Sequence, residues 1–367
     1  MDIAKDHIEQ ILAKIEDPIS QGDLVKAGRV AKIEISQGAE VTILLRFPSS
    51  LQADQKSNLI FRCVQEIQAQ HAEAQVHVHV ETALRDVPQA RQILPHVANI
   101  IAIGSGKGGV GKSTVSTNLA MALKEKGFRV GLLDADLYGP SIPAMLGLEG
   151  QRPKVQDIGG KTRIIPLEGH GISVMSIGFV VEPEQAVVLR GPRLAGIIKQ
   201  FILECQWPAL DYLLIDLPPG TGDIQLTLVQ TVPVTGAVIV TTPQKIAVID
   251  AVKALNMFRL PSINVPILGI VENMAWFTPK PHPDEKYHLF GQGGGERLAE
   301  MGETKLLGQI PLIQDVTAGG EEGLPSYRNT EHTETRRNFE SLANELIDAV
   351  DRRNSGRAAT EPVQIKG

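Results

Sequence analysis

The sequence is poor in cysteine and lacks long apolar runs. Its 367 residues include only two cysteines, Cys63 and Cys205, which lie far apart; this excludes a disulfide framework and a local cysteine metal motif. No apolar run approaches the ~20 residues that span a bilayer. The first residues, Met1 to Asp6, show no basic region followed by an apolar core, so we expect neither a signal peptide nor a membrane partner.

Positive charge is also in deficit. The chain carries 36 lysines and arginines against 42 aspartates and glutamates, a formal net charge of −6. This balance disfavours a nucleic-acid partner and suits a cytoplasmic protein. The 43% hydrophobic content and the 35 glycines are typical of an α/β protein with many tight loops, and the length allows about two or three domains.

The most informative segment is a glycine-rich stretch from Gly104 to Thr114. Residues 106–113 fit the phosphate-loop pattern G-x-x-x-x-G-K-[ST]. The apolar run at 97–103 has strand length and residues 115–126 favour a helix, so the motif has the strand–loop–helix setting that it needs. The plain alternative, a tight glycine turn, explains neither the Gly-Lys-Ser end of the motif nor the carboxylates that follow it.

The chemistry of such a loop is phosphate binding. Glycines let successive backbone N–H groups turn toward phosphate oxygens, and the following helix adds its positive end. Lys112 then reaches the outer phosphates, and the Ser113 hydroxyl binds Mg²⁺, so the loop predicts a site for ATP and Mg²⁺. The predicted nucleotide-binding residues of the loop are Gly106, Lys107, Gly108, Gly109, Val110, Gly111, Lys112, Ser113 and Thr114.

Three aspartates follow apolar runs of strand length. Asp134 and Asp136 follow one such run, and Asp216 follows another. Carboxylates at the carboxyl ends of parallel strands face the ligand crevice. We expect Asp134 and Asp216 to serve Mg²⁺ together with Ser113, and Asp136 to orient the attacking water. Helix capping is the structural alternative for Asp134 and Asp136.

Two further segments belong to the predicted nucleotide site. Residues 217–223 read Leu-Pro-Pro-Gly-Thr-Gly-Asp, which suits a loop that senses the γ-phosphate. A third apolar run, at 265–271, leads into Glu272-Asn273-Met274. From that position Asn273 is predicted to hydrogen-bond the adenine edge.

Strands and helices alternate from residue 97 to 353. This alternation predicts an α/β, P-loop NTPase fold whose mostly parallel sheet carries helices on both faces. Residues 1–83 predict a separate small α+β domain in the order α–β–β–α–β, joined by a proline-containing linker at 84–96. An apolar helix face at 335–353 predicts packing on the protein's own sheet, and residues 354–367 predict a disordered tail.

These motifs together resemble a known family. Lys107 directly follows the first loop glycine, which resembles the deviant phosphate loop of the ParA/MinD class of ATPases. Asp-Ala-Asp-Leu-Tyr-Gly-Pro-Ser at 134–141, Arg-Gly-Pro at 190–192, Asp-Leu-Pro-Pro-Gly-Thr-Gly-Asp at 216–223 and Glu-Asn-Met at 272–274 follow in that order. With them, the chain resembles the Mrp (ApbC) family of iron–sulfur cluster carrier ATPases.

The resemblance covers nearly the whole chain, and residues 1–83 resemble the small MIP18-type domain of iron–sulfur assembly factors. It implies ATP binding and slow hydrolysis by a homodimer in which Lys107 reaches the partner's nucleotide. Lys107, Lys112 and Asp136 are then the catalytic residues. The resemblance also implies a [4Fe–4S] cluster that is delivered to apoprotein clients, and contacts with iron–sulfur assembly proteins.

One departure concerns the cluster site. Family members carry Cys-x-x-Cys shortly after Glu-Asn-Met, whereas residues 277–290 here contain no cysteine, and thiolates are the main ligands of iron–sulfur clusters. His282 and His288 are alternative ligands, with exposed loop histidines as the plainer interpretation. Two other functions therefore stay open: a ParA/MinD-like positioning switch, and an ATP-gated assembly scaffold without its own cluster.

Overall fold

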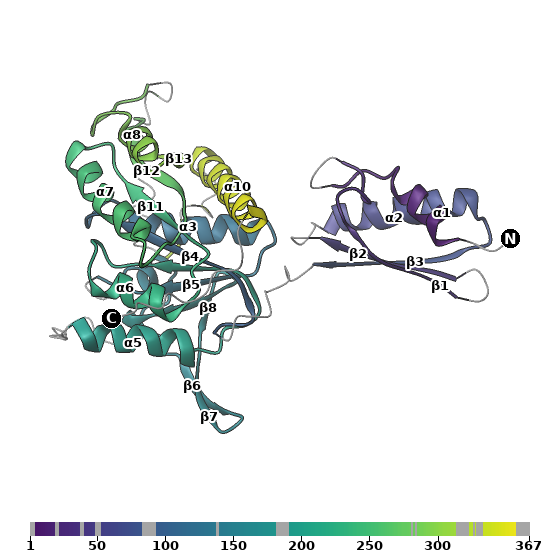
Figure 1. Cartoon of the computed structure of the whole chain (residues 1–367), viewed down its shortest axis with the longest axis horizontal. Coiled ribbons are helices and arrows are strands. Elements are labelled where there is room, and N and C mark those ends of the chain that lie inside the picture. The colour runs from purple at the N-terminus through teal and green to yellow at the C-terminus, as the bar shows by residue number, and fades with distance from the viewer. Residues whose placement is uncertain are drawn as a thin grey trace. The chain divides into compact units, whose positions relative to one another are not determined.

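The chain divides into two compact units, Met1–Asp86 and Val87–Gly367, and each is described by itself (Figure 1). The boundary between the units lies inside the segment 84–96 that the sequence predicts as a linker. In this computed structural model the described residues are 4–18, 22–36, 40–47, 53–82, 93–136, 139–180, 191–279, 282, 285–312, 323–325, 327 and 333–356.

The first unit is a three-stranded sheet with two helices. Its elements are α1 (Lys5–Leu12), β1 (Val30–Ser36), β2 (Glu40–Phe47), α2 (Ala53–Gln70) and β3 (Gln75–Thr82). The strands are ordered β1-β2-β3, with β1 antiparallel and β3 parallel to β2. Alternate residues of β2 are buried, as expected for a strand with one face on a core. The element order is the one that the sequence predicts.

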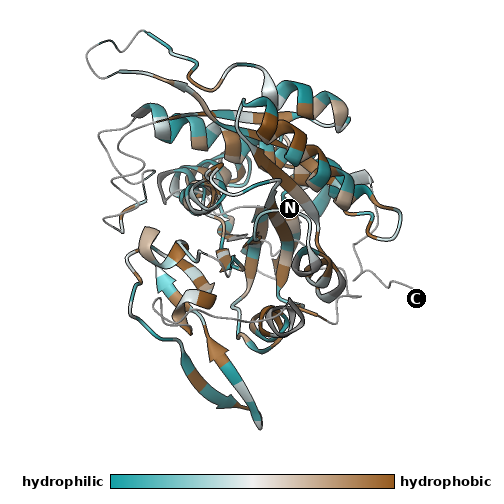
Figure 2. Ribbon diagram, turned by 90° about the vertical axis from the view of Figure 1, so that its left-hand side faces the viewer, coloured by the Kyte–Doolittle hydropathy of each residue, from teal (hydrophilic) through white to brown (hydrophobic). Residues whose placement is uncertain are grey.

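The second unit is built on an eight-stranded sheet in the order β13-β12-β11-β4-β10-β5-β9-β8. Neighbouring strands are parallel except β8, which is antiparallel to β9. The bounds are β4 (Val97–Ser105), β5 (Val130–Asp134), β8 (Leu167–Gly169), β9 (Ile172–Ser176), β10 (Leu210–Asp216), β11 (Gly236–Thr241), β12 (Ile267–Phe277) and β13 (Leu306–Leu312). Every residue of β4, β5, β10 and β11 is buried, because helices cover both faces, and the central strands are largely hydrophobic (Figure 2).

The helices of the second unit lie on both sides of this sheet (Figure 1). They are α3 (Lys112–Glu125), α4 (Ile142–Met145), α5 (Gly191–Glu204), α6 (Asp223–Thr231), α7 (Lys245–Arg259), α8 (Gly294–Met301) and α10 (Thr333–Gly356). Helices α3 and α10 contact each other on one side, while α5 contacts α6 and α7 contacts α8 on the other. The predicted P-loop NTPase architecture is confirmed. Within the described ranges, no helix is both long and apolar enough to cross a bilayer.

Helix α10 packs against β12, β13 and α3, which confirms the predicted packing on the protein's own sheet. Its buried apolar side chains include Phe339, Leu342, Leu346 and Val350. The helix continues to Gly356, so the predicted disordered tail is wrong for residues 354–356. One stabilising contact there joins Asn354 Nδ2 to Asn99 Oδ1 at 3.0 Å. The rest of the predicted tail, 357–367, lies outside the described residues.

Candidate functional site

The glycine-rich loop at 106–111 joins the end of β4 to the start of α3. Gly109 and Gly111 each have a φ of 77°, a left-handed conformation that favours glycine. Gly106 is needed for a different reason, which is lack of space. A Cβ at this position would lie 2.1 Å from the backbone carbonyl carbon of Asp250 in α7. The loop is therefore a tight turn at the N-terminus of a helix, an arrangement that suits anion binding.

Lys112 is the first residue of α3, and its side chain is buried. Its Nζ donates a hydrogen bond to Asp216 Oδ2 at 2.7 Å and lies 3.6 Å from Asp136 Oδ2. It also lies 3.3 Å from Ser113 Oγ. A buried ammonium requires a paired charge, and the aspartates supply it. The structure thus brings the predicted phosphate-binding lysine together with two of the predicted carboxylates.

Asp216, the last residue of β10, is the centre of this cluster. Its buried carboxylate accepts hydrogen bonds from Ser113 Oγ at 2.6 Å and from Ser116 Oγ at 2.5 Å, in addition to Lys112. Sequence reasoning misses Ser116. Its spacing of four residues from Lys112, which places both side chains on one face of α3, is the signal that could have found it.

Asp134, the last residue of β5, lies directly beside Asp216 in the parallel register. Its Oδ2 accepts from Ser176 Oγ at 2.9 Å, and its Oδ1 accepts from the Asp136 backbone N–H at 3.1 Å. Burial, together with the neighbouring charge of Asp216, raises the pKa of Asp134 to about 8. Two adjacent carboxylates and the Ser113 hydroxyl are the hard oxygen donors that Mg²⁺ prefers, so these residues fit the metal.

The loop after β10 is held against the phosphate loop. The Gly220 N–H donates to the Ser105 carbonyl at 2.9 Å. Gln225 Nε2 donates to the carbonyls of Pro218 and Gly220, at 2.9 and 3.1 Å. Gln225 is a support that the sequence does not indicate, because its role depends on how the loop folds back onto α6. This loop therefore lies beside the phosphate loop, and its role as a γ-phosphate sensor stays a prediction.

Lys107 makes different contacts from Lys112. Its Nζ donates to Gln244 Oε1 at 3.3 Å, immediately before α7, and its carbonyl accepts from Ser105 Oγ at 3.0 Å. Among the described residues it contacts no carboxylate. The structure therefore separates the two loop lysines, with Lys112 among the aspartates and Lys107 beside α7.

Asn273 lies within β12 rather than after a strand that ends at 271. The strand is longer than the sequence predicts because an irregularity after Asn273 lets pairing with β13 resume at Phe277. The buried Nδ2 of Asn273 donates to the Val110 carbonyl at 2.8 Å, and Met274 has a φ of 56°. The structure gives Asn273 this contact with the phosphate loop, and its contact with adenine stays a prediction.

The segment that lacks cysteine holds both candidate histidine ligands. His288 Nδ1 lies 3.0 Å from the carbonyl of Ala275, and His282 Nδ1 lies 3.6 Å from a carboxylate oxygen of Glu285. In the described part of the chain, no three His, Cys, Asp or Glu side chains gather as they would around a metal ion. The two histidines therefore stay a prediction as cluster ligands.

Both cysteines are buried, in the cores of separate units. Cys63 lies in α2 of the first unit, and Cys205 follows α5 in the second. Burial raises the pKa of each thiol to about 12. Because the thiolate is the metal ligand, these two protonated thiols do not fit an iron–sulfur cluster in the folded chain.

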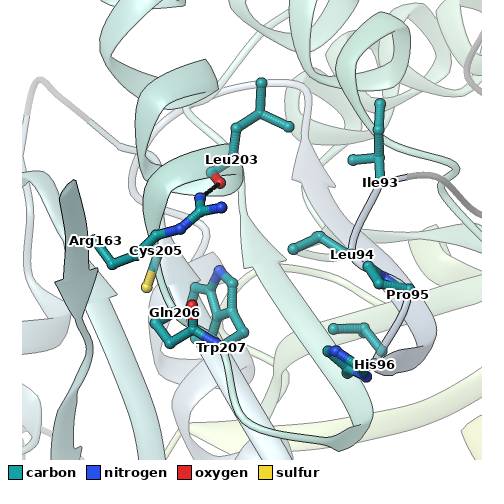
Figure 3. Close-up of a pocket in the computed structure, with 10 residues that line it drawn as sticks. Ile93, Leu94, Pro95, His96, Arg163, Leu203, Cys205, Gln206 and Trp207 are labelled. Carbon is teal, nitrogen blue, oxygen red and sulfur yellow. Dashed lines mark hydrogen bonds between the residues drawn. The ribbon is translucent and has the colours of Figure 1, made fainter. Parts of the chain in front are cut away.

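A cavity of about 280 Å³ lies at the opposite end of β4 from the phosphate loop (Figure 3). Its lining includes Pro95 and His96, which precede β4, and Cys205 and Trp207, which follow α5. Because β4 starts at Val97 beside this cavity and ends at the loop, the cavity is separate from the phosphate-binding end of the sheet.

The fold and the loop define a P-loop NTPase. The family model described as NUBPL iron-transfer P-loop NTPase matches residues 96–347, more than half of the chain. The chain therefore belongs to this ParA-type family of iron-transfer P-loop NTPases.

Relatives across nearly the whole chain carry the name iron–sulfur cluster carrier protein. One from Synechocystis sp. is 41% identical over 95% of this chain and 98% of its own length, so the match extends into the first unit. One from Escherichia coli K12 is 49% identical over 69% of this chain and 66% of its own length. These matches confirm the resemblance to the Mrp (ApbC) family.

Solved structures agree with the fold. A nucleotide-binding protein from Archaeoglobus fulgidus, in complex with ADP, has a TM-score of 0.57 and 38% identity, covering 66% of this chain and 94% of that one. The cell-division ATPase MinD from Pyrococcus furiosus, with a TM-score of 0.51 and 24% identity over 68% of this chain and 98% of that one, shares the fold.

Proposed function

We propose that the chain is an ATP-hydrolysing carrier of iron–sulfur clusters that acts as a homodimer in the cytoplasm. Its main support is the cluster of Lys112, Ser113, Asp134 and Asp216 beneath the phosphate loop, in a chain whose relatives are named iron–sulfur cluster carrier proteins. A [4Fe–4S] cluster would be its cargo. Apoprotein clients and iron–sulfur assembly proteins would be its partners.

The proposed hydrolysis uses both the phosphate loop and the aspartates at the strand ends beneath it. The backbone N–H groups of the loop bind ATP phosphates, and Lys112 exchanges its carboxylate partner for the outer phosphates. Ser113 and the two strand-end aspartates, Asp134 and Asp216, would hold Mg²⁺, which when bound would supply positive charge to neutralise the transferred phosphoryl group. Asp136, which lies 3.6 Å from the Lys112 ammonium, orients the attacking water.

The homodimer is proposed to form on the face of the loop that carries Lys107. Gln244, which accepts a hydrogen bond from Lys107, immediately precedes α7. Ile246 and Ile249, near the start of that helix, are 69% and 50% exposed. Apolar side chains beside a nucleotide loop suit burial against a second copy, and Lys107 would then reach the partner's nucleotide.

Matched lysine variants test this function. Lys112→Ala should abolish tight Mg-ATP binding in a direct nucleotide-binding assay, because this lysine meets the phosphates in its own subunit. Lys107→Ala should bind ATP nearly normally as a monomer but lose hydrolysis and ATP-linked dimerisation. Hydrolysis at the parental rate in Lys107→Ala, or unchanged ATP affinity in Lys112→Ala, would contradict the proposal.

The buried, protonated thiols favour a second candidate function, an ATP-gated assembly factor whose cluster ligands come from another molecule. Anaerobic reconstitution with iron and sulfide, counted per dimer with and without glutathione, separates the two. A cluster retained only with glutathione or a client supports the second function. A stable cluster in the Cys63→Ser/Cys205→Ser variant without added thiol would instead point to His282 and His288.

A further inference from the structure

A two-stranded hairpin, β6 (Lys154–Ile158) and β7 (Lys161–Ile165), extends away from the eight-stranded sheet (Figure 1). Its turn is Gly159-Gly160, with φ of 63° and 74°, and positive φ at both positions is what a type I′ turn requires. Asp157 Oδ1 accepts from the Gly160 N–H at 2.9 Å and secures the turn. The tip of the hairpin is therefore well defined.

Strand β7 anchors the hairpin to the rest of the unit. The Gln206 N–H donates to the Ile164 carbonyl at 2.8 Å, and Ile164 forms a bridge with Cys205. Arg163 Nη1 donates to the Leu203 carbonyl at 2.8 Å (Figure 3). Strand β6, in contrast, pairs only with β7 among the described strands. The outer edge of β6 is therefore free.

The backbone groups on this free edge come from Val155 and Asp157. The register pairs Ile158 with Lys161 across the two-residue turn, and such a flanking pair is hydrogen-bonded. Pair types alternate along an antiparallel ladder, so residues 155 and 157 belong to non-hydrogen-bonded pairs and their N–H and C=O groups point outward. Ile164, which pairs with Val155, is consistent with this assignment, because its carbonyl accepts a hydrogen bond from Gln206, outside the hairpin.

The two faces of the hairpin differ in chemistry, because paired residues share a face and neighbours along a strand alternate. One face carries Val155, Asp157, Thr162 and Ile164, and the other carries Lys154, Gln156, Ile158, Lys161, Arg163 and Ile165. The second face thus has three basic residues and no acidic one. All of β6 is exposed, with Val155 at 63%, and hydrophobic and hydrophilic residues both occur along the hairpin (Figure 2). Neither Lys154 nor Lys161 forms an ion pair with a described residue.

We propose that the β6 edge binds an extended segment of a partner protein in which acidic and apolar residues alternate. The segment would pair with the outward backbone groups of residues 155 and 157 as an added strand. Its acidic side chains would lie on the face that carries both lysines, next to Lys154 on β6 and one strand away from Lys161 on β7. Its apolar side chains would lie beside Val155. The site is independent of the nucleotide site, so its failure would leave the proposed ATPase function intact.

A second copy of this chain is a poor occupant of the same edge. Two hairpins paired edge to edge about a two-fold axis would bring their basic faces to the same side. Like charges opposite each other destabilise a strand pair, and lysine on an edge strand normally prevents self-pairing. The lysines that repel the basic face of a second hairpin would attract the acidic side chains of an added strand.

Fluorescence anisotropy on the full chain tests the charge requirement. The probe is a fluorescein-labelled peptide of alternating glutamate and valine. Lys154→Glu/Lys161→Glu should weaken its binding about tenfold or more, since it reverses two charges on the face that receives the acidic side chains, and added salt should weaken binding to the unchanged protein. The matched control Lys14→Glu/Lys56→Glu makes the same change of net charge at exposed positions of the first unit and should leave the affinity unchanged.

A proline variant tests the backbone pairing. Val155→Pro removes an N–H that the β6–β7 ladder does not use, so the hairpin persists by circular dichroism while the added strand loses a partner and its affinity falls about tenfold. A peptide of the same composition in the order Glu-Glu-Val-Val should also bind about tenfold more weakly. The proposal is overturned if the unchanged protein fails to bind, if both peptides bind equally, or if both variants bind normally. A dimer that dissociates in Val155→Pro would overturn it too, in favour of a second copy.

Discussion

A single side chain, Asn273, braces the phosphate loop from a neighbouring strand through its 2.8 Å hydrogen bond to the Val110 carbonyl. Asn273→Ala should weaken ATP binding about two- to tenfold, because one buried hydrogen bond contributes about 0.5–1.5 kcal/mol. Calorimetric titration with ATP and GTP measures the loss. Equal losses identify a loop brace, and a loss for ATP alone would establish the predicted adenine contact. Unchanged affinity for both nucleotides would contradict both roles.

Asp134 should make the stability of the folded protein depend on pH. Its pKa is raised to about 8 in the fold, against about 3.9 for an unperturbed aspartate. A raised carboxyl pKa means that the folded state holds the proton more tightly, so this stabilisation is complete below about pH 3.9 and is lost as the pH rises through about 8. With a chelator present, Tm should fall between about pH 4 and 8 and level off above that, and Asp134→Asn should flatten that fall. An unchanged slope in the variant would assign the dependence to other groups.

Residues of the site differ in how far the sequence predicts them. Lys112 and Ser113 follow from a local motif, and Asp134 and Asp216 from apolar runs that end at the same edge of a parallel sheet. The hydroxyl that supports Asp134 comes from Ser176, on another strand. That partner depends on strand order, which the local pattern of the chain does not contain.

At the scale of the elements, the phosphate loop packs closely against α7 at Gly106. Gly106→Ala should destabilise the fold by about 1–3 kcal/mol, the range for overpacking, because its Cβ would meet the backbone of Asp250 and Ala251 at 2.1 and 2.2 Å. Gly108→Ala is the matched control, since the nearest atom there, Pro219 Cγ, is 3.9 Å away. Urea unfolding compares the two variants. Equal stabilities would contradict this packing.

The order of the elements follows largely from the sequence, because buried parallel strands such as β4 and β10 are continuous apolar runs. The β6–β7 hairpin does not, since its strands are mostly exposed and give no such run. The sequence also does not predict the extension of β12 to Phe277, because this extension depends on pairing with β13 that resumes after an irregularity beyond Asn273. Local apolar patterns therefore predict the core strands but not the β6–β7 hairpin or the extension of β12.

In the whole molecule, each of the two units has a hydrophobic core of its own. The core of the first includes Ile8, Ile43 and Ile67, and the core of the second includes Ile101 and Leu214, with no residue shared. The charged and hydroxyl contacts around the phosphate loop all come from the second unit. Nucleotide binding is therefore expected to be a property of the second unit.

A chain that begins at Val87 tests this expectation. Because the two sets of contacts share no residues, its ATP affinity and hydrolysis rate should stay within about twofold of those of the full chain. Both are measured on shortened protein whose folding is checked by circular dichroism. Lys112→Ala in the same shortened chain is the control and should remove tight ATP binding. If the shortened chain is folded yet binds ATP about tenfold more weakly, the first unit contributes to the nucleotide site and the two units are not energetically separate.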